Sequence, residues 1–307
     1  MSQLPTHARY PYSGISQRPD YSWPEGRRLA VYIGVNLEHF SFAQGLGAKL
    51  APSAEPDVLN YAWRDYGNRV GAWRLLELFD ALRLPVAVLA NTAIYDYCPE
   101  LMAAHRLRGD EVVGHGHTNS ERQSDMSEAE EAALIRACMA RIEKEEGKKP
   151  RGWLSPWIAE SRSTPDMLKD AGFDYTLNWC HDDQPLPFLT RGGEFWSMPY
   201  PQEINDIPAI IARQNSATEF SDMIIGCYDE MKAQSERQPL VMGIALHPYI
   251  VGQPHRLHEL RRALQHIVSD GCAWLTRPGE ILDHVRRVAS VYRGRLPLNA
   301  RISDSAR

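Results

Sequence analysis

The sequence lacks the features that mark several large classes of protein. No apolar run approaches the roughly 20 residues that a membrane-spanning helix needs. The five cysteines are scattered and odd in number, with no C-x-x-C pair, which argues against a disulfide framework and against a cysteine zinc site. A net charge of -5 provides no attraction for nucleic acid or for an anionic membrane. We therefore expect neither as a partner.

Glycine-rich nucleotide motifs and nucleophile motifs are also missing. The chain has no G-x-G-x-x-G fingerprint, no Walker motif and no G-x-S-x-G turn around Ser155, so the sequence does not indicate a dinucleotide enzyme, an NTPase or an α/β-hydrolase serine. Residues 1–5 carry neither a basic flank nor a hydrophobic stretch of the kind found in secretory signals, and we expect a cytoplasmic protein.

What the sequence does contain is three apolar runs that end in groups capable of chemistry. The first run ends at Asn36, Glu38 and His39, the second at His115 and the third at His247. Short apolar runs rich in β-branched residues predict buried parallel strands. Polar residues at the carboxyl ends of such strands face the active site of a barrel. One such strand end is compatible with a solvated loop, whereas three together indicate a site.

The order of the predicted elements favours a single α/β barrel. Strands alternate with helices in about seven repeats, which predicts right-handed βαβ units and a parallel sheet. We expect an extended arm over residues 1–28, one barrel domain over 29–292 and a loosely held tail over 293–307. The aperiodic stretch 41–61 directly follows Glu38 and His39, and a loop of that length is a candidate lid.

Local sequence patterns predict several individual helices and strands. The spacing of Val70, Trp73, Leu76 and Phe79 predicts a helix over 67–83. A capping box at residues 127–130 opens a long helix that Gly147 ends. We expect a strand over 175–179 and a turn-rich strand segment over 195–210.

From residue 24 to residue 288 the chain resembles the polysaccharide deacetylase superfamily, and within it the branch that contains metal-independent allantoinase and the cyclic imide hydrolases. Four segments carry the resemblance: 36–39, 109–116, 151–156 followed by 182–185, and 246–248 followed by 252–256. The resemblance implies a distorted (β/α)7 barrel of the polysaccharide deacetylase type. It also implies a homo-oligomer, which the extended arm would suit.

The departures from the family pattern concern the metal. Deacetylases of this superfamily hold a divalent metal with an aspartate and two histidines and use a second aspartate as base. In this sequence Glu38 stands at the base position, His39 at the metal-aspartate position and Asn119 at the second histidine, so that only His115 matches. An amide oxygen is a poor zinc ligand. We expect no cofactor, with zinc held by His39, His115 and Asn119 as the alternative.

Roles follow for the remaining candidates. Glu38 is the predicted general base, with a pKa that burial should raise toward neutrality. His247 would protonate the leaving nitrogen or stabilise the oxyanion, and His115 would orient the substrate if it does not bind a metal. The residues expected around the substrate are Asn36, His39, Asn119, Trp157, Trp179, Asp182 and Asp183. For the two tryptophans a core position, and for the two aspartates a loop-bracing role, remain open.

The resemblance implies a hydrolase of carbon–nitrogen amide bonds in a small cyclic ureide or imide, such as an allantoin-, hydantoin- or succinimide-like ring. The alternatives are a metal-dependent N-deacetylase and an inactive barrel that acts as a binding protein. The identity of the ring is not encoded in any motif of the sequence.

Overall fold

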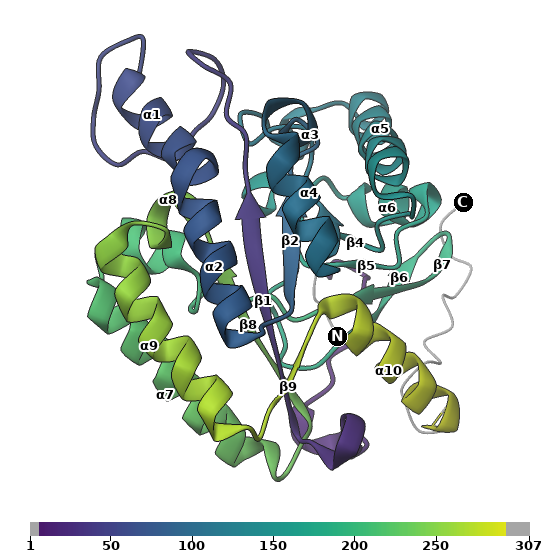
Figure 1. Ribbon diagram of the computed structural model, residues 1–307. Coiled ribbons are helices and arrows are strands. Elements are labelled where there is room, and N and C mark those ends of the chain that lie inside the picture. Colours follow the sequence, from purple (N-terminus) through teal and green to yellow (C-terminus); the bar gives the residue numbers. More distant parts are fainter. Residues whose placement is uncertain (1–5, 293–307) are drawn as a thin grey trace.

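The computed structural model describes residues 6–292, which form one curled sheet of nine strands surrounded by helices (Figure 1). The strands are β1 (Leu29–Leu37), β2 (Val86–Ala90), β3 (Glu111–Gly114), β4 (Gly152–Trp153), β5 (Tyr175–Thr176), β6 (Leu186–Thr190), β7 (Gly193–Ser197), β8 (Leu240–Leu246) and β9 (Trp274–Thr276). They run in the order β6-β7-β5-β4-β3-β2-β1-β8, and β9 pairs with β1. The expected α/β barrel of the polysaccharide deacetylase type is confirmed.

Strand β1 is the centre of this sheet. One of its edges pairs with β8 from Leu29 to Val35, while the other edge pairs with β9 over its first half and with β2 over its second half. All pairs are parallel except the β6–β7 hairpin. Between β7 and β8 the described residues make one isolated parallel bridge, from Asn205 to Ala245. The backbone N–H of Val241 in β8 also donates a hydrogen bond to the carbonyl of Asp183, so the barrel is closed by isolated contacts rather than by a continuous strand pair.

The helices cover the outside of the sheet. They are α1 (Val58–Tyr66), α2 (Ala72–Leu82), α3 (Ile94–Tyr97), α4 (Pro99–Arg108), α5 (Glu128–Glu146), α6 (Thr164–Ala171), α7 (Ala217–Ser235), α8 (Pro248–Val251), α9 (Pro254–Asp270) and α10 (Pro278–Tyr292), with π-helical segments at Gly67–Gly71 and Ile207–Ala212. Helices α7 and α9 lie side by side on the flank of the β1–β8 pair (Figure 1). No helix in the described part of the chain is both long and apolar enough to cross a membrane.

Side chains of β1 alternate between two hydrophobic cores. Val31 and Ile33 belong to the outer core that packs against the helices, whereas Ala30 and Tyr32 belong to the core inside the barrel. This alternation is the two-residue period of an extended strand. Continued along the chain, it puts the side chain of Glu38 on the inner face and that of His39 on the outer face.

Most predicted elements are present, with shifted boundaries. The capping box that opens α5 is formed by Ser127 and Glu130, as the sequence predicts. The helix expected over 67–83 begins earlier, at Val58, because Asp57 caps it, and it continues through the π-helical segment into α2. The strand expected over 175–179 has only two residues, and the β6–β7 hairpin is an element that the sequence patterns did not separate.

The described part of the arm, residues 6–28, lies on its own barrel. Arg18 forms an ion pair with Asp182 at 2.6 Å, and the indole of the buried Trp23 donates a hydrogen bond to the carbonyl of Leu240. Residues 293–307, predicted as a tail, lie outside the described residues.

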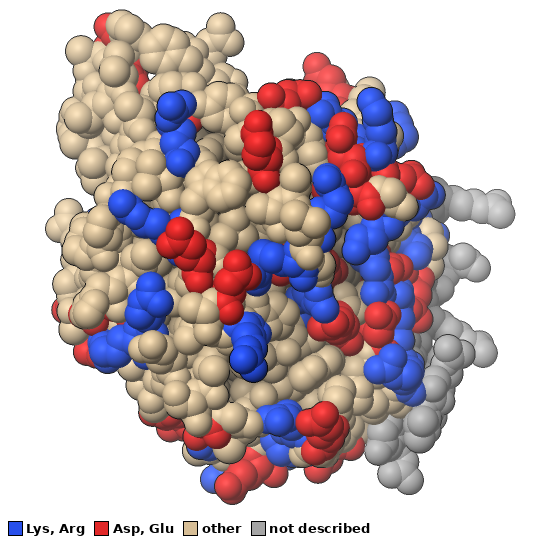
Figure 2. All heavy atoms as spheres, in the orientation of Figure 1, with Lys and Arg blue, Asp and Glu red and all other residues tan. Residues whose placement is uncertain are grey.

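The stretch before α1 forms a lobe that projects from the body of the molecule (Figure 1). Residues 41–57 contain turns but no helix or strand, and Leu46 is tied to the carbonyl of Ser120 by a backbone hydrogen bond. Figure 2 shows few charged side chains on this lobe, and Phe42, Leu50 and Val58 are each at least half exposed. The lid function predicted for this stretch stays a prediction.

Glycines allow the helix that contains the π-helical segment to approach α8 closely. A Cβ atom at Gly71 would lie 2.1 Å from the carbonyl oxygen of Pro248, and one at Gly252 would lie 2.3 Å from the same oxygen. Gly71 has ordinary helical backbone angles, so glycine is needed there only because a side chain would not fit. The backbone of α8 is held directly against Gly71, the residue that immediately precedes α2.

We predict that Gly71→Ala destabilises the protein by about 1–3 kcal/mol, the usual penalty of overpacking, because α8 must move outward. The measurement is the free energy of unfolding in urea. Gly226→Ala is the matched control, since nothing lies within 4 Å of a Cβ placed there in α7 and alanine favours a helix. Equal effects of the two substitutions would contradict the packing argument.

Candidate active site

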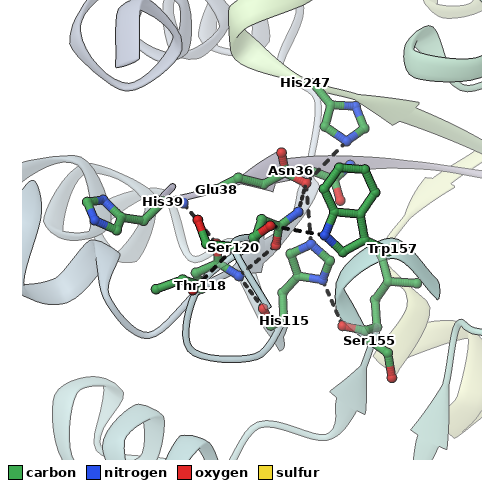
Figure 3. Close-up of polar contacts among 12 residues, drawn as sticks. Asn36, Glu38, His39, His115, Thr118, Ser120, Ser155, Trp157 and His247 are labelled. Carbon is green, nitrogen blue, oxygen red and sulfur yellow. Dashed lines mark hydrogen bonds and ion pairs between the residues drawn. The ribbon is translucent and has the colours of Figure 1, made fainter. Parts of the chain in front are cut away.

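A cavity of about 150 Å³ opens where the carboxyl ends of β1, β3 and β8 meet. Figure 3 shows Asn36, Glu38, His115 and His247 converging there, with Trp157 beside them. The cavity is lined by Asn36, Glu38, Phe40, Ala48, His115, Asn119, Leu154, Ser155, Trp157, Ile158, Tyr200, Gln202, Asn205, Ile207, Pro208, His247 and Tyr249. The three strand ends singled out in the sequence thus come together in one place.

The carboxylate of Glu38 lies at the centre of the site and is only 5% exposed. Its Oε1 accepts a hydrogen bond from Nδ2 of Asn119 at 2.5 Å, and its Oε2 accepts one from the hydroxyl of Tyr249 at 2.9 Å. The Nε2 atoms of His115 and His247 both lie 3.5 Å from Oε1. Three of these neighbours, Asn119, Tyr249 and His247, are groups that can donate a proton to the carboxylate.

His247 is held between two carboxylates. Its Nδ1 is 2.6 Å from Oδ1 of Asp206, and its backbone N–H donates to Oδ2 of the same side chain at 2.7 Å. Asp206 is fully buried. With Nδ1 directed at Asp206, Nε2 of the ring faces Glu38 and the cavity, so a proton on Nε2 is available to a bound molecule.

His115 and Asn119 are fixed by the backbone around them. The Nδ1 of His115 lies 2.7 Å from the carbonyl oxygen of Leu154, which requires a proton on Nδ1 and leaves Nε2 facing Glu38. The side chain of Asn91 donates to the carbonyl of His115 and, at 3.0 Å, to Oδ1 of Asn119. That second bond sets the orientation of the Asn119 amide, so that its NH₂ group points at Glu38.

The protonation states of this cluster depend on one another. Burial by itself would raise the pKa of Glu38, but the positive charge of His247 and hydrogen bonds from His115 and His247 outweigh it and lower the pKa to about 2. Burial would lower the pKa of His247, but Asp206 and Glu38 raise it to about 10. Burial raises the pKa of Asp206, and His247 partly offsets this. At neutral pH the site therefore holds an ionised Glu38 and a protonated His247.

The predicted upward shift of the Glu38 pKa is thus wrong. The prediction considered burial alone and did not include the cation that Asp206 holds next to Glu38. A carboxylate with a low pKa is a weak base. Glu38 therefore binds a proton only weakly as long as His247 beside it is positively charged.

Four residues expected around the substrate lie elsewhere. The ring of His39 packs on Tyr97, with centroids 4.9 Å apart, and points away from the cluster (Figure 3). Trp179 packs against Phe188 and donates to Glu160, Asp182 pairs with Arg18, and Asp183 lines a separate cavity. Asn36, Asn119 and Trp157 do line the cavity.

The alternative metal set of His39, His115 and Asn119 is not assembled, because His39 faces the opposite side of the strand. Glu38, not His39, is the residue beside His115 and Asn119. In the described residues no group of three or more histidine, cysteine, aspartate or glutamate side chains is arranged to hold a metal ion. The NH₂ of Asn119 and the proton on His247 are donors aimed at Glu38, whereas a metal requires lone pairs. The donor set therefore does not fit the aspartate and two histidines of the deacetylases.

Three functional side chains were missed by the sequence reasoning. Tyr249 lies in α8, two residues after His247, and Asn91 follows the apolar run of β2, so each is close in sequence to a strand end already identified. Asp206 lies in the turn-rich stretch expected over 195–210, and no local pattern marks it as the partner of a residue 41 positions away. Asp206 can be identified as a functional residue only from its position in the folded structure.

We predict that Asp206→Asn lowers the pKa of His247 by on the order of 1–3 units, the shift that loss of an adjacent opposite charge produces. The sign follows from the causes: without Asp206, burial lowers the pKa and only Glu38 opposes it. Titration of the imidazole nitrogens by NMR would measure the change. Asp283→Asn, which removes a carboxylate paired with Arg151, should leave the titration of His247 unaltered. No shift in the Asp206 variant would show that this carboxylate does not hold the proton on His247.

The chain is similar in sequence and in structure to proteins of one superfamily. The peptidoglycan deacetylase of Helicobacter pylori is 24% identical over 284 residues, which cover 81% of this chain and 94% of that protein. Two solved structures, those of Puue allantoinase and of a probable polysaccharide deacetylase from Pseudomonas aeruginosa PAO1, each superpose with a TM-score of 0.79 at 24% identity, over 91% of this chain and 98% of the other. No family model matches the sequence. At this identity the structural likeness establishes the fold.

Proposed function

We propose that the chain, which is similar to polysaccharide deacetylase-type proteins in sequence and in fold, is a hydrolase that opens a carbon–nitrogen amide bond in a small molecule. The observation that supports this best is the buried row of Asp206, His247 and Glu38 at the wall of the cavity. It pairs a proton donor with a proton acceptor within one site, which hydrolysis of an amide requires.

The reaction has two proton transfers to or from the reacting molecules, and a third restores the site. Water attacks the carbonyl carbon and loses a proton to Glu38, so that a carbon–oxygen bond forms. The carbon–nitrogen bond then breaks, and the nitrogen takes the proton from Nε2 of His247. The proton on Glu38 returns to His247 through the cluster or solvent, which restores the starting state. Asn119 and Tyr249, which donate to the carboxylate of Glu38, keep it oriented during this exchange.

The coupling of the two pKa values explains how Glu38 retains the proton that it takes from water. While His247 is charged, its field keeps the pKa of Glu38 low. When His247 gives its proton to the departing nitrogen, that field disappears and the pKa of Glu38 rises. The basicity of Glu38 therefore increases at the moment when it must hold a proton.

The size of the cavity favours a small substrate. A volume of about 150 Å³ is below the ~300–1,000 Å³ of pockets that hold drug-sized ligands. Phe40, Leu154, Ile158 and Pro208 supply an apolar wall. We propose a five- or six-membered cyclic ureide or imide as the substrate class, in line with the name of the allantoinase that shares the fold.

A second candidate is a metal-dependent N-deacetylase, favoured by the names of the curated relative and of one of the two solved structures. Glu38 and His115 would be the protein ligands, because their facing atoms are 3.5 Å apart. For this function the amide of Asn119 would have to turn over, and Nε2 of His247 would have to lose its proton. Each change breaks a hydrogen bond or an ion pair at Glu38.

We predict that Glu38→Gln lowers kcat for ring opening by about 10²–10⁴, the usual contribution of a general base, because an amide cannot accept the proton of water. Steady-state kinetics on a panel of cyclic ureides and imides would test this. His39→Gln is the matched control from the neighbouring position and should retain wild-type kinetics, since its ring packs on Tyr97 outside the cavity. Unchanged activity of the Glu38 variant would favour a role for the barrel in binding only.

A measurement of metal content separates the two candidate functions. We expect less than stoichiometric metal by plasma mass spectrometry, and ring opening that persists after dialysis against a chelator, because the donors around Glu38 do not suit a cation. One metal per chain, with activity that a chelator abolishes and zinc restores, would instead establish the metal-dependent deacetylase.

We propose that the protein is a cytoplasmic homo-oligomer that acts on a small molecule, in line with the resemblance described above and with the small volume of the cavity.

A further inference from the structure

One segment of the cavity wall carries polar groups that the mechanism above does not use. This segment, residues 200–206, connects β7 to the π-helical turn Ile207–Ala212. Its last residue is Asp206, which holds His247. Tyr200 and Asn205 line the cavity from the same segment, and both are about 95% buried.

The amide of Asn205 is fixed in orientation. Its Oδ1 accepts a hydrogen bond from the backbone N–H of Ile207 at 3.1 Å, and its backbone forms the bridge to Ala245 that closes the barrel. With Oδ1 occupied by an N–H donor, the NH₂ group must point the other way. Among the described residues that NH₂ group has no hydrogen-bond acceptor. Its two N–H bonds are therefore available to a molecule in the cavity.

The hydroxyl of Tyr200 also has a proton to donate and no acceptor for it. Its oxygen accepts a hydrogen bond from Nδ2 of Asn36 at 3.3 Å, and Asn36 also donates to the carbonyl of Leu246. An amide NH₂ cannot accept a proton, so the O–H of Tyr200 needs another acceptor. The described residues provide none. Burial raises the pKa of Tyr200, so the hydroxyl keeps its proton at neutral pH.

We propose that Tyr200 and Asn205 bind a second carbonyl oxygen of the substrate, one that is not attacked, and thereby select imides and ureides over simple lactams. The inference rests on the proposed ring-opening function. Buried donors without acceptors cost free energy, and a ligand that supplies an acceptor recovers it. A ring with carbonyls on both sides of its nitrogen presents one oxygen for attack and another for this pair. A lactam lacks the second oxygen and would leave both donors unpaired.

The same segment carries both a residue proposed to bind the substrate and the residue that holds His247. Asn205 and Asp206 are adjacent, and the backbone that carries them is held by the bridge to β8, whose strand runs on to His247. A substrate carbonyl that engages Asn205 is therefore positioned relative to the same backbone that positions the proton donor.

The test uses substitutions that remove one donor and keep the local structure. Tyr200→Phe removes the O–H and leaves the ring. Asn205→Asp keeps an oxygen for the N–H of Ile207 and replaces the NH₂ group. The readouts are kcat/KM for the best imide or ureide of the panel, and the inhibition constant of the lactam 2-pyrrolidinone as a competitor of that substrate. Controls are Tyr95→Phe, whose hydroxyl contacts Glu146, and Asn215→Asp, which adds the same charge outside the cavity lining.

We expect each active-site variant to lower kcat/KM for the imide by roughly tenfold or more, the value of one uncharged hydrogen bond. The lactam inhibition constant should stay within about twofold, because the lactam makes no contact with the deleted donor. Equal weakening of imide and lactam, or an unchanged imide, would overturn the assignment of Tyr200 and Asn205 while the wild-type enzyme still opens rings. If the wild-type enzyme opens no ring of the panel, the proposed function fails, and this inference fails with it.

Discussion

A buried negative charge, that of Glu38, is the constraint on which the site depends. An ionised carboxylate removed from water is stable only if donors and an opposite charge replace its hydration. Here Asn119 and Tyr249 provide hydrogen bonds, and His247 provides the charge. His247 can remain protonated in this buried position because Asp206 faces its other nitrogen. The reactive state of the site is therefore shared among residues of four separate chain segments.

These four segments reach the site by different structural means. Glu38 and His247 continue two strands that pair directly, so their separation is set by the register of β1 and β8. Tyr249 lies on α8, whose backbone is held against Gly71 and Gly252. Asp206 follows Asn205, whose backbone forms a bridge to Ala245 of β8. Asn119 is oriented by Asn91 from the end of β2. Packing far from the cavity thus determines the chemistry within it.

The proposed mechanism assigns two tasks to different residues. In it Glu38 and His247 carry the protons, while Tyr200 and Asn205, which line the same cavity, have no part in proton transfer. The site thus combines a fold shared with a probable polysaccharide deacetylase and an allantoinase with a cluster in which amide and imidazole groups face the carboxylate of Glu38.

The sequence by itself determined the barrel class and the strand ends at Glu38, His115 and His247, because apolar runs and their carboxyl ends are local patterns. Strict use of the two-residue period would also have excluded His39, whose side chain lies on the face opposite Glu38. Only the tertiary structure decided that Asp206 faces His247, and hence that the pKa of Glu38 falls where burial alone predicts a rise. A pKa depends on the charges within a few ångströms, and those come from residues far apart in the chain.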